Sequence, residues 1–296
     1  MSWTSPFSLP GKWFKGNLHT HTTASDGLLS PEEAIAWYRE RGYDFVALTD
    51  HWVLSEKTSV ATDFVTIRGT ELDGPGYHLV ALGIDSLPAR ELAESPQALV
   101  KDVVAQGGLA FFAHPYWTGQ TSADIAPVQG ILGLEVFNSV CEQMIGRGYA
   151  RVHWDDLLAQ GRRLYGFAVD DVHWKHGAAG KGFVMVRAEE LTEEALLQAL
   201  RKGHFYASTG PAILDLRLIH QDDGQLALFV HCSPCQEIVF FASGPLGRRF
   251  VAEERLLTSA SFHLLPEQVY LRVECRDPFG GVAWSNPIFV QDVLKA

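Results

Sequence analysis

The chain has 296 residues, of which 47% are hydrophobic and 20% charged, so it can bury the core of one or two domains and is not disordered. Its 24 Lys and Arg against 35 Asp and Glu give a formal charge of −11, which argues against a broad surface that grips DNA or RNA phosphates. An anionic substrate would therefore need a local source of positive charge, such as a metal ion.

The sequence gives no sign of export or of a membrane span. Residues 1–16 lack a basic segment followed by an apolar stretch, and no run of about 18 apolar residues occurs in the chain. Among the four cysteines, Cys232 and Cys235 form one C-x-x-C pair, and a four-thiolate zinc site would need a second pair. We therefore expect a cytoplasmic protein, without a membrane partner, whose cysteines are reduced or buried.

The first 210 residues alternate between short apolar runs and amphipathic stretches. The Ser-Pro-Glu-Glu segment at 30–33 predicts a helix that ends near residue 41, and further helices are expected at 96–107, 154–160 and 192–203. Such alternation predicts an α/β domain with a largely parallel sheet, open or closed into a barrel. The predicted strands are 17–20, 45–49, 64–68, 78–83, 109–113, 132–137, 164–169 and 183–186.

The pattern changes after Gly210 and Pro211. Short alternating strands follow, separated by turn residues, and no long helical pattern is present. We expect one domain at 1–210 and a second, antiparallel β domain at 211–296, with the form of a small sandwich packed against the first. The clearest strands of this second domain are 214–219, 226–231, 237–242 and 269–274.

Histidines and acids follow the predicted strands of the first domain. His19 and His21 stand two residues apart on an extended segment, so both imidazoles can face one metal ion. In a parallel α/β fold the carboxyl ends of the strands share one face, where barrel enzymes build their active sites. Imidazole and carboxylate without thiolate suit zinc, manganese or iron in a reactive site. The other candidates are Asp26, Asp50, His51, Glu71, His78, His114, Asp170, Asp171 and His173.

Each of these residues also has a structural interpretation. Asp50 and Asp170 are suited to capping helices, and His114, beside a proline, could be a hydrogen-bonded core residue. A single H-x-H pair is a weak signal. Chance placement of so many His and acid residues at strand ends is a much poorer explanation than a metal cluster.

The ordered motifs resemble the PHP (polymerase and histidinol phosphatase) superfamily over residues 15–210. The resemblance implies a distorted (β/α)7 TIM-like barrel with two or three divalent metal ions at the carboxyl ends of its strands. The segment at 202–211, followed by a β domain, resembles the carbaryl-hydrolase-related (CehA/McbA-like) branch, whose members include phosphoesterases. The matching motifs are LHTHT at 18–22 with Asp26 and Gly27, TDH at 49–51, GTE at 69–71, His78, AHP at 113–115 and DVH at 171–173.

The resemblance also implies a ligand set. One ion would be held by His19, His21, Glu71 and Asp171, with Asp171 chosen over Asp170 because of its D-x-H spacing to His173. Glu71 would bridge to a second ion bound by His78 and His114, although His78 stands only seven residues after Glu71 and its reach is open. A third ion would take Asp26, His51 and His173.

The implied activity is a metal-dependent phosphoesterase acting on small, anionic phosphomonoesters or phosphodiesters through an activated hydroxide. His51, Glu71 and Asp171 are the predicted catalytic residues, and His51 or a water would protonate the leaving group. Two alternatives stay open: hydrolysis of carboxyl esters or carbamates at the same site, and a non-enzymatic role with structural metals. A homo-oligomer is also compatible with the sequence. The predicted substrate-binding residues are Trp52, Tyr116, Lys175 and His176.

Overall fold

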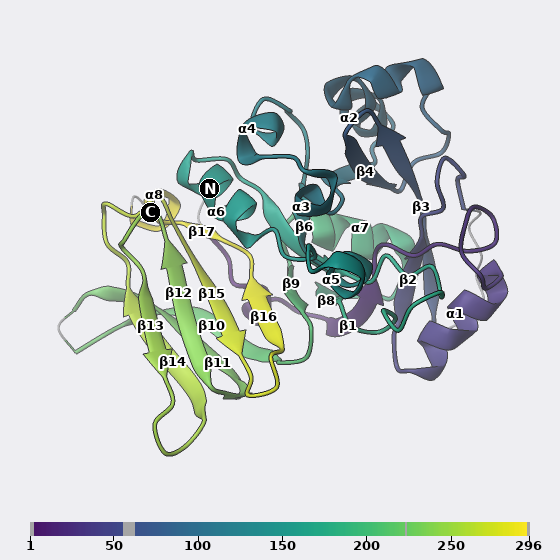
Figure 1. Cartoon of the computed structure of the whole chain (residues 1–296). Helices are drawn as coiled ribbons and strands as arrows, with labels where there is room; N and C mark the ends of the chain where they lie inside the picture. The colour runs from purple at the N-terminus through teal and green to yellow at the C-terminus, as the bar shows by residue number, and fades with distance from the viewer. Residues whose placement is uncertain (1–2, 56–62, 223, 295–296) are drawn as a thin grey trace.

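The computed structural model describes residues 3–55, 63–222 and 224–294. The first part of the chain forms a strongly curved sheet with helices around it (Figure 1). Its strands are β1 (Lys12–Asn17), β2 (Phe45–Leu48), β3 (Val65–Gly74), β4 (Tyr77–Leu82), β5 (Leu109–Phe112), β6 (Gly133–Asn138), β7 (Tyr165–Val169), β8 (Phe183–Ala188) and β9 (Phe205–Ser208).

The sheet is mixed and contains two parallel blocks. β1, β2 and β3 pair in parallel, as do β5, β6 and β7, whereas β4 joins the two blocks with antiparallel partners on both sides. Only residues 75 and 76 connect β3 to β4, and a connection that short permits only an antiparallel pair. The expected mixed α/β class is confirmed, while the expectation of a largely parallel sheet is wrong for β4, β8 and β9. The count of seven βα units remains a prediction.

The last strand of this sheet, β7, approaches β1 beside the carboxyl ends of both strands. Thr20 and Val172 form a parallel bridge, and the His21 amide donates to the Val172 carbonyl at 3.1 Å. The Asp171 amide donates to the His19 carbonyl at 2.9 Å. The segments that carry the first and last predicted ligands are thereby tied together.

The long predicted helices are present, and the short ones were not predicted. The helix at 154–160 begins three residues earlier than expected, at Arg151. The unpredicted α3, α4 and α5 have only four to seven residues, too few for a helical period to appear in the sequence. The helices are η1 (Pro6–Ser8), α1 (Pro31–Glu40), η2 (Arg90–Glu94), α2 (Pro96–Ala105), α3 (Pro115–Thr118), α4 (Ser122–Ile125), α5 (Ser139–Ile145), α6 (Arg151–Ala159), α7 (Glu193–Arg201) and α8 (Val290–Leu294).

The C-terminal strands form a second lobe (Figure 1). β10, β11 and β14 make one antiparallel sheet, whose apolar side chains share a core with those of β12 and β15. β16 pairs with β9, so the larger sheet runs without interruption from this lobe into the first part of the chain. The lobe's strands are β10 (Ile213–His220), β11 (Leu226–Cys235), β12 (Glu237–Ala242), β13 (Arg248–Val251), β14 (Leu257–His263), β15 (Tyr270–Arg276), β16 (Val282–Ser285) and β17 (Ile288–Phe289).

A further β domain is therefore confirmed, and the boundary at 210/211 stays a prediction. All four cysteines are free and buried, as expected. Within the described ranges, no helix combines the length and the apolar character needed to cross a bilayer.

Candidate metal centre

The predicted metal ligands lie together at one end of the curved sheet, because most of them follow the carboxyl end of a strand within a few residues. Most are buried, and Asp26 is the most exposed, at 49%. The set consists of His19 and His21 after β1, Asp26 in the next loop, His51 after β2, Glu71 on β3, His78 on β4, His114 after β5, and Asp171 and His173 after β7.

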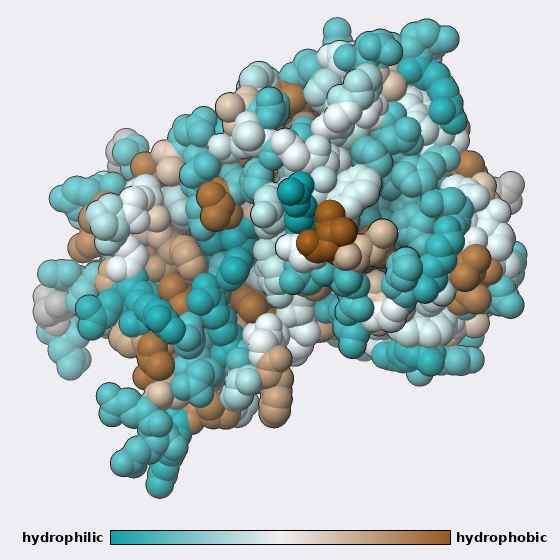
Figure 2. All heavy atoms as spheres, in the orientation of Figure 1, coloured by the Kyte–Doolittle hydropathy of each residue, from teal (hydrophilic) through white to brown (hydrophobic). Residues whose placement is uncertain are grey.

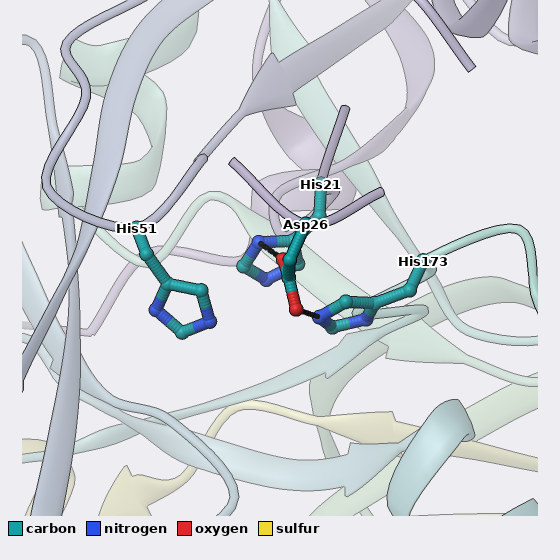
Figure 3. Close-up of side chains that lie close together, drawn as sticks. All are labelled: His21, Asp26, His51 and His173. Atoms are coloured by element: carbon teal, nitrogen blue, oxygen red, sulfur yellow. Dashed lines mark ion pairs between the residues drawn. The ribbon is translucent and has the colours of Figure 1, made fainter. Parts of the chain in front are cut away.

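Three overlapping groups of these side chains have ligand atoms close enough to hold an ion. His19, His21, Glu71 and Asp171 form the most buried group. His51 and His78 form a second with Glu71, and His21, Asp26, His51 and His173 form a third (Figure 3). Figure 3 shows His51 and His173 on either side of Asp26, with His21 behind it. Glu71 and His21 each belong to two groups, so the ligand sets are contiguous.

The hairpin of β3 and β4 explains how His78 reaches the centre. The register pairs Glu71 with Val80 and Asp73 with His78, so the chain reverses within a few residues. His78 Nδ1 lies 2.7 Å from Glu71 Oε1, and His114 Nε2 lies 3.1 Å from the same oxygen. The short sequence distance between Glu71 and His78, which left the reach of His78 open, is therefore no obstacle.

The donor atoms have the distances from one another that are expected of a metal site, and some of them lack a hydrogen-bond partner. His19 Nε2 and His21 Nε2 lie 3.1 Å apart, and each lies 3.1 Å from Glu71 Oε2. Ligands placed 2.0–2.1 Å from a tetrahedral ion stand roughly 3.3 Å from each other. His114 Nδ1 and Asp171 Oδ1 are buried without a hydrogen-bond partner among the described residues. The residues thus fit a divalent ion in both chemistry and arrangement.

In the metal-free protein, protons partly compensate the buried carboxylates. Burial disfavours the charged ring of His19, but Asp171, Glu71 and Glu135 outweigh it and raise the pKa of His19 well above its usual range. The same balance of burial against Asp171 and Glu71 raises the pKa of His21 to about 9. Burial alone would raise the pKa of Glu71, yet the neighbouring histidines hold it well below its usual value. The centre therefore attracts positive charge, as protons or as metal ions.

Residues with strained backbone angles lie at the same centre. Four non-glycine residues in the described part of the chain have positive φ angles, and each is a predicted ligand or the neighbour of one. His114 has φ 25° and Asp171 has φ 53°, while Trp52 follows His51 with φ 51° and Trp174 follows His173 with φ 63°. Such angles are unfavourable for side chains with a Cβ atom and are typical of functional sites.

Glu135 supports the ligands and was not among the predicted site residues. This buried carboxylate on β6 lies 2.6 Å from His19 Nδ1 and accepts the His114 amide at 2.7 Å. Asn138 donates to Glu135 at 2.8 Å and to Asp171 at 3.1 Å. A carboxylate on the far nitrogen of a ligating histidine fixes the tautomer and orientation of the ring. An acid inside an otherwise apolar strand was the sequence signal for this role.

Asp50 and Asp170 have structural roles, but the helix-capping role that the sequence suggested is wrong for both. Asp50 accepts hydrogen bonds from the Thr22 amide, the Thr22 hydroxyl and Ser25. Asp170 accepts the Tyr38 hydroxyl and the backbone amides of residues 180–182. Both therefore organise loops beside the centre, and Asp171 rather than Asp170 stands among the ligand atoms.

A cavity of about 290 Å³ opens onto the ligand groups. Two predicted substrate-binding residues, Lys175 and His176, line it. Trp52 and Tyr116 do not: Trp52 is buried with its indole N–H donating to the Asp73 carbonyl, and Tyr116 stacks near His153 and Arg147. Both follow ligand motifs in sequence, but their backbone directs them away from the cavity.

Comparison with known proteins identifies the fold. No family model matches the chain. The crystal structure of a two-domain protein containing a predicted PHP-like metal-dependent phosphoesterase, from Bacteroides vulgatus ATCC 8482, covers 95% of this chain and 98% of its own, with a TM-score of 0.51 and 15% identity. The chain has a PHP-like fold. The resemblance inferred from the motifs is thereby confirmed for the fold, and the carbaryl-hydrolase-related branch stays a prediction.

Two other similarities are partial. A 5'-3' exoribonuclease of Haemophilus influenzae is 33% identical over 96 residues, which are 29% of this chain and 35% of that protein, so the chain spans about a third of the relative's length. An amidohydrolase from Chromobacterium violaceum, with bound sulfate and no metal, covers 53% of this chain and 87% of its own at 18% identity. Its TM-score of 0.39 is too low to carry an argument.

Proposed function

We propose that this PHP-like protein is a metal-dependent hydrolase of small phosphomonoesters or phosphodiesters. The observation that carries the proposal is the convergence of the predicted ligands, from both parallel blocks and β4, beside one cavity: eight of them form three overlapping groups, and His114 contacts Glu71, which two of the groups share. The donors are imidazoles and carboxylates, which suit zinc, manganese or iron in a reactive site. The predicted phosphoesterase of the Bacteroides protein and the exoribonuclease of Haemophilus agree with phosphoester chemistry.

Two or three ions would be held by this chain. His19, His21, Glu71 and Asp171 would hold the most buried one. Glu71 would share a second with His78, with either His51 or His114 completing the set, because both imidazoles lie within 3.5 Å of Glu71. The third would take Asp26, His51 and His173, beside His21. Divalent ions in such sites lower the pKa of water towards neutrality and neutralise charge on substrate oxygens.

The remaining tasks fall to the chain's own side chains. Lys175 and His176 line the cavity, and their N–H groups would bind phosphate oxygens. His51 is partly exposed at the cavity, with its Nδ1 3.3 Å from Asp73 Oδ1, so it is the candidate to carry a proton to the leaving group where His114 completes the second set and no third ion is bound. Glu135 would hold His19 in one tautomer. The cytoplasmic location and the possible homo-oligomer remain predictions from the sequence.

The test combines metal analysis with parallel assays. We expect the purified protein to hold about two or three equivalents of a divalent metal, and to hydrolyse aryl phosphates or phosphodiesters when loaded with Mn²⁺ or Zn²⁺. Chelation should abolish turnover, and restoring the metal should restore it. Naphthyl carboxyl esters, assayed beside naphthyl phosphates, separate the two chemistries. Metal without phosphoester turnover, but with ester turnover, would establish the alternative reaction.

A further inference from the structure

The cavity beside the metal centre has an apolar part as well as a polar one. Three of its lining residues are apolar and come from α3 and α5: Trp117, Val140 and Met144. We call these three residues the apolar shelf. The polar part consists of the ligand groups together with Lys175 and His176, which follow β7. One cavity thus offers two unlike environments to a single molecule.

Two of the three shelf residues expose large apolar side chains to solvent. Trp117 is 38% exposed and Met144 is 55% exposed, and Ile145 beside it is 56% exposed. Figure 2 shows the corresponding brown patch over α5 on this face of the molecule. A cluster of exposed apolar side chains at a cavity is a common mark of a binding surface. Trp117 also stands close to the centre, with its ring 5.0 Å from His114 and 6.0 Å from His78.

We propose that the cavity selects phosphoesters whose organic part carries an aromatic ring. The ring would lie on Trp117 and Met144, while the phosphate faces the ligand groups, Lys175 and His176. Aromatic rings gain from packing against indole and thioether groups, and methionine adapts to rings of different shape. Val140 and Met144 have no hydrogen-bonding group of useful strength, so a polyol in that place would lose bonds to water without replacement. The phosphate half of the proposal rests on the proposed function.

The decisive measurement is direct binding of two non-hydrolysable phosphonates to the metal-loaded protein by calorimetry. At a pH where phenylphosphonate and propylphosphonate are both dianions they carry the same charged group, so the ratio of their dissociation constants there reports on the organic part. We expect phenylphosphonate to bind about tenfold more tightly, the gain for burying one ring face. Equal dissociation constants in the unmodified protein would overturn the proposal.

Met144 and Ile145 offer a matched pair of variants. They are neighbours on α5 and equally exposed, but Met144 alone lines the cavity. Met144→Ser should reduce the phenyl preference to about threefold or less, whereas Ile145→Ser should keep it near tenfold. The proposal is also wrong if Met144→Ser changes the molecular mass in solution and leaves the phenyl preference intact, since the shelf would then be a contact between subunits.

Two further ligands separate the sources of the ring. A preference for adenosine 5'-monophosphate over ribose 5-phosphate identifies a nucleobase on the shelf, and a phenyl preference without it identifies aryl esters. Failure of this proposal is distinct from failure of the proposed function. Phosphoester turnover without a ring preference refutes only the shelf, and a ring preference without turnover refutes only the hydrolase.

Discussion

Two clusters of buried charge in this protein are built in opposite ways. At the metal centre, the carboxylates of Glu71, Glu135 and Asp171 face imidazoles, and no Lys or Arg of the described residues forms an ion pair with them. Where the β lobe meets α6, the fully buried Arg272 donates to both oxygens of Asp155 at 2.7 and 2.6 Å and to Glu274 at 2.8 Å.

This difference in partners distinguishes buried charges that stabilise the fold from buried charges that are available for function. Arg272 is a permanent cation whose guanidinium also lies between the rings of Trp154 and Phe241, at 4.6 and 4.3 Å. That cluster is therefore complete within the chain and holds the β lobe to α6. No Lys or Arg of the described residues pairs with the carboxylates of the centre, although Lys175 lines its cavity, so the charge balance of these carboxylates depends on protons and metal ions that can be exchanged. Breaking each cluster should consequently affect different properties of the protein.

The largest effect is expected from Asp171→Asn. The substitution keeps the shape of the side chain but removes a carboxylate from the most buried ligand group. We expect turnover to fall about 10³-fold or more, with loss of the most tightly bound metal. A chelator should lower the melting temperature of the unmodified protein and change that of the variant little. Asp85→Asn, at an exposed ion pair with Arg68, is the control that should keep metal and activity.

Arg272→Ala should instead damage the fold. It removes the buried partner of Asp155 and Glu274. Because Glu274 keeps Arg276 and Arg151, we expect a loss near the lower end of the range of about 3–5 kcal/mol typical of a broken buried pair. Urea unfolding measures the loss, and the activity per folded molecule should stay unchanged. Arg249→Ala removes an exposed pair with Glu237 in the same lobe and should shift the midpoint little. A metal-free Asp171→Asn protein that unfolds as easily as Arg272→Ala would contradict the distinction between the clusters.

Glu135→Gln tests the layer behind the ligands. Glutamine can still contact His19, but it removes the charge that fixes the Nδ1 proton. Loss of such a partner typically lowers metal affinity 10–100-fold. Competition with a metal-binding dye measures the change, and turnover at saturating metal should recover most of its value. Unchanged affinity would show that His19 is oriented by packing alone.

The sequence predicted the ligands better than their surroundings. His19, His114 and Asp171 closely follow strands and Glu71 lies on one, so local pattern and fold agree, and the structure brings them together. Glu135 and Arg272 were missed because their roles depend on partners more than 100 residues away in the chain. The antiparallel β4 and its turn were likewise invisible to apolar periodicity, which identifies a strand without giving its direction. Trp52 and Tyr116 were misjudged as neighbours of the cavity because sequence adjacency does not specify side-chain direction.

The stability of the metal-free protein should depend on pH because protons on the histidines of the centre compensate its carboxylates. The pKa of His21 is raised to about 9, because nearby carboxylates outweigh burial, so the folded protein holds a proton that the unfolded chain releases near pH 6.5. The stability from this proton is present below pH 6.5 and is lost as pH rises towards 9. Urea unfolding across this range should show the decline without metal and a much weaker one with Zn²⁺ or Mn²⁺. An equal decline in both states would argue that the ions do not replace the protons.

The stability of the cluster around Arg272 should respond to pH in the opposite direction. Burial would raise the pKa of Glu274, but Arg272, Arg276 and Arg151 outweigh it and hold that pKa below its usual value. The stability from its charge is therefore present above the unfolded pKa of about 4.3 and is lost as pH falls below it. Because one proton is involved, the free energy of unfolding can change by at most about 1.4 kcal/mol per pH unit from this group. Glu274→Gln should remove that contribution at acidic pH and leave the loss of stability at alkaline pH unchanged. Unfolding free energies of the two proteins between pH 3 and 6 measure the difference. If the variant lost stability with falling pH as steeply as the unmodified protein, the proton uptake would belong to other carboxylates. The charge of Glu274 would then not stabilise the cluster around Arg272 as its geometry indicates.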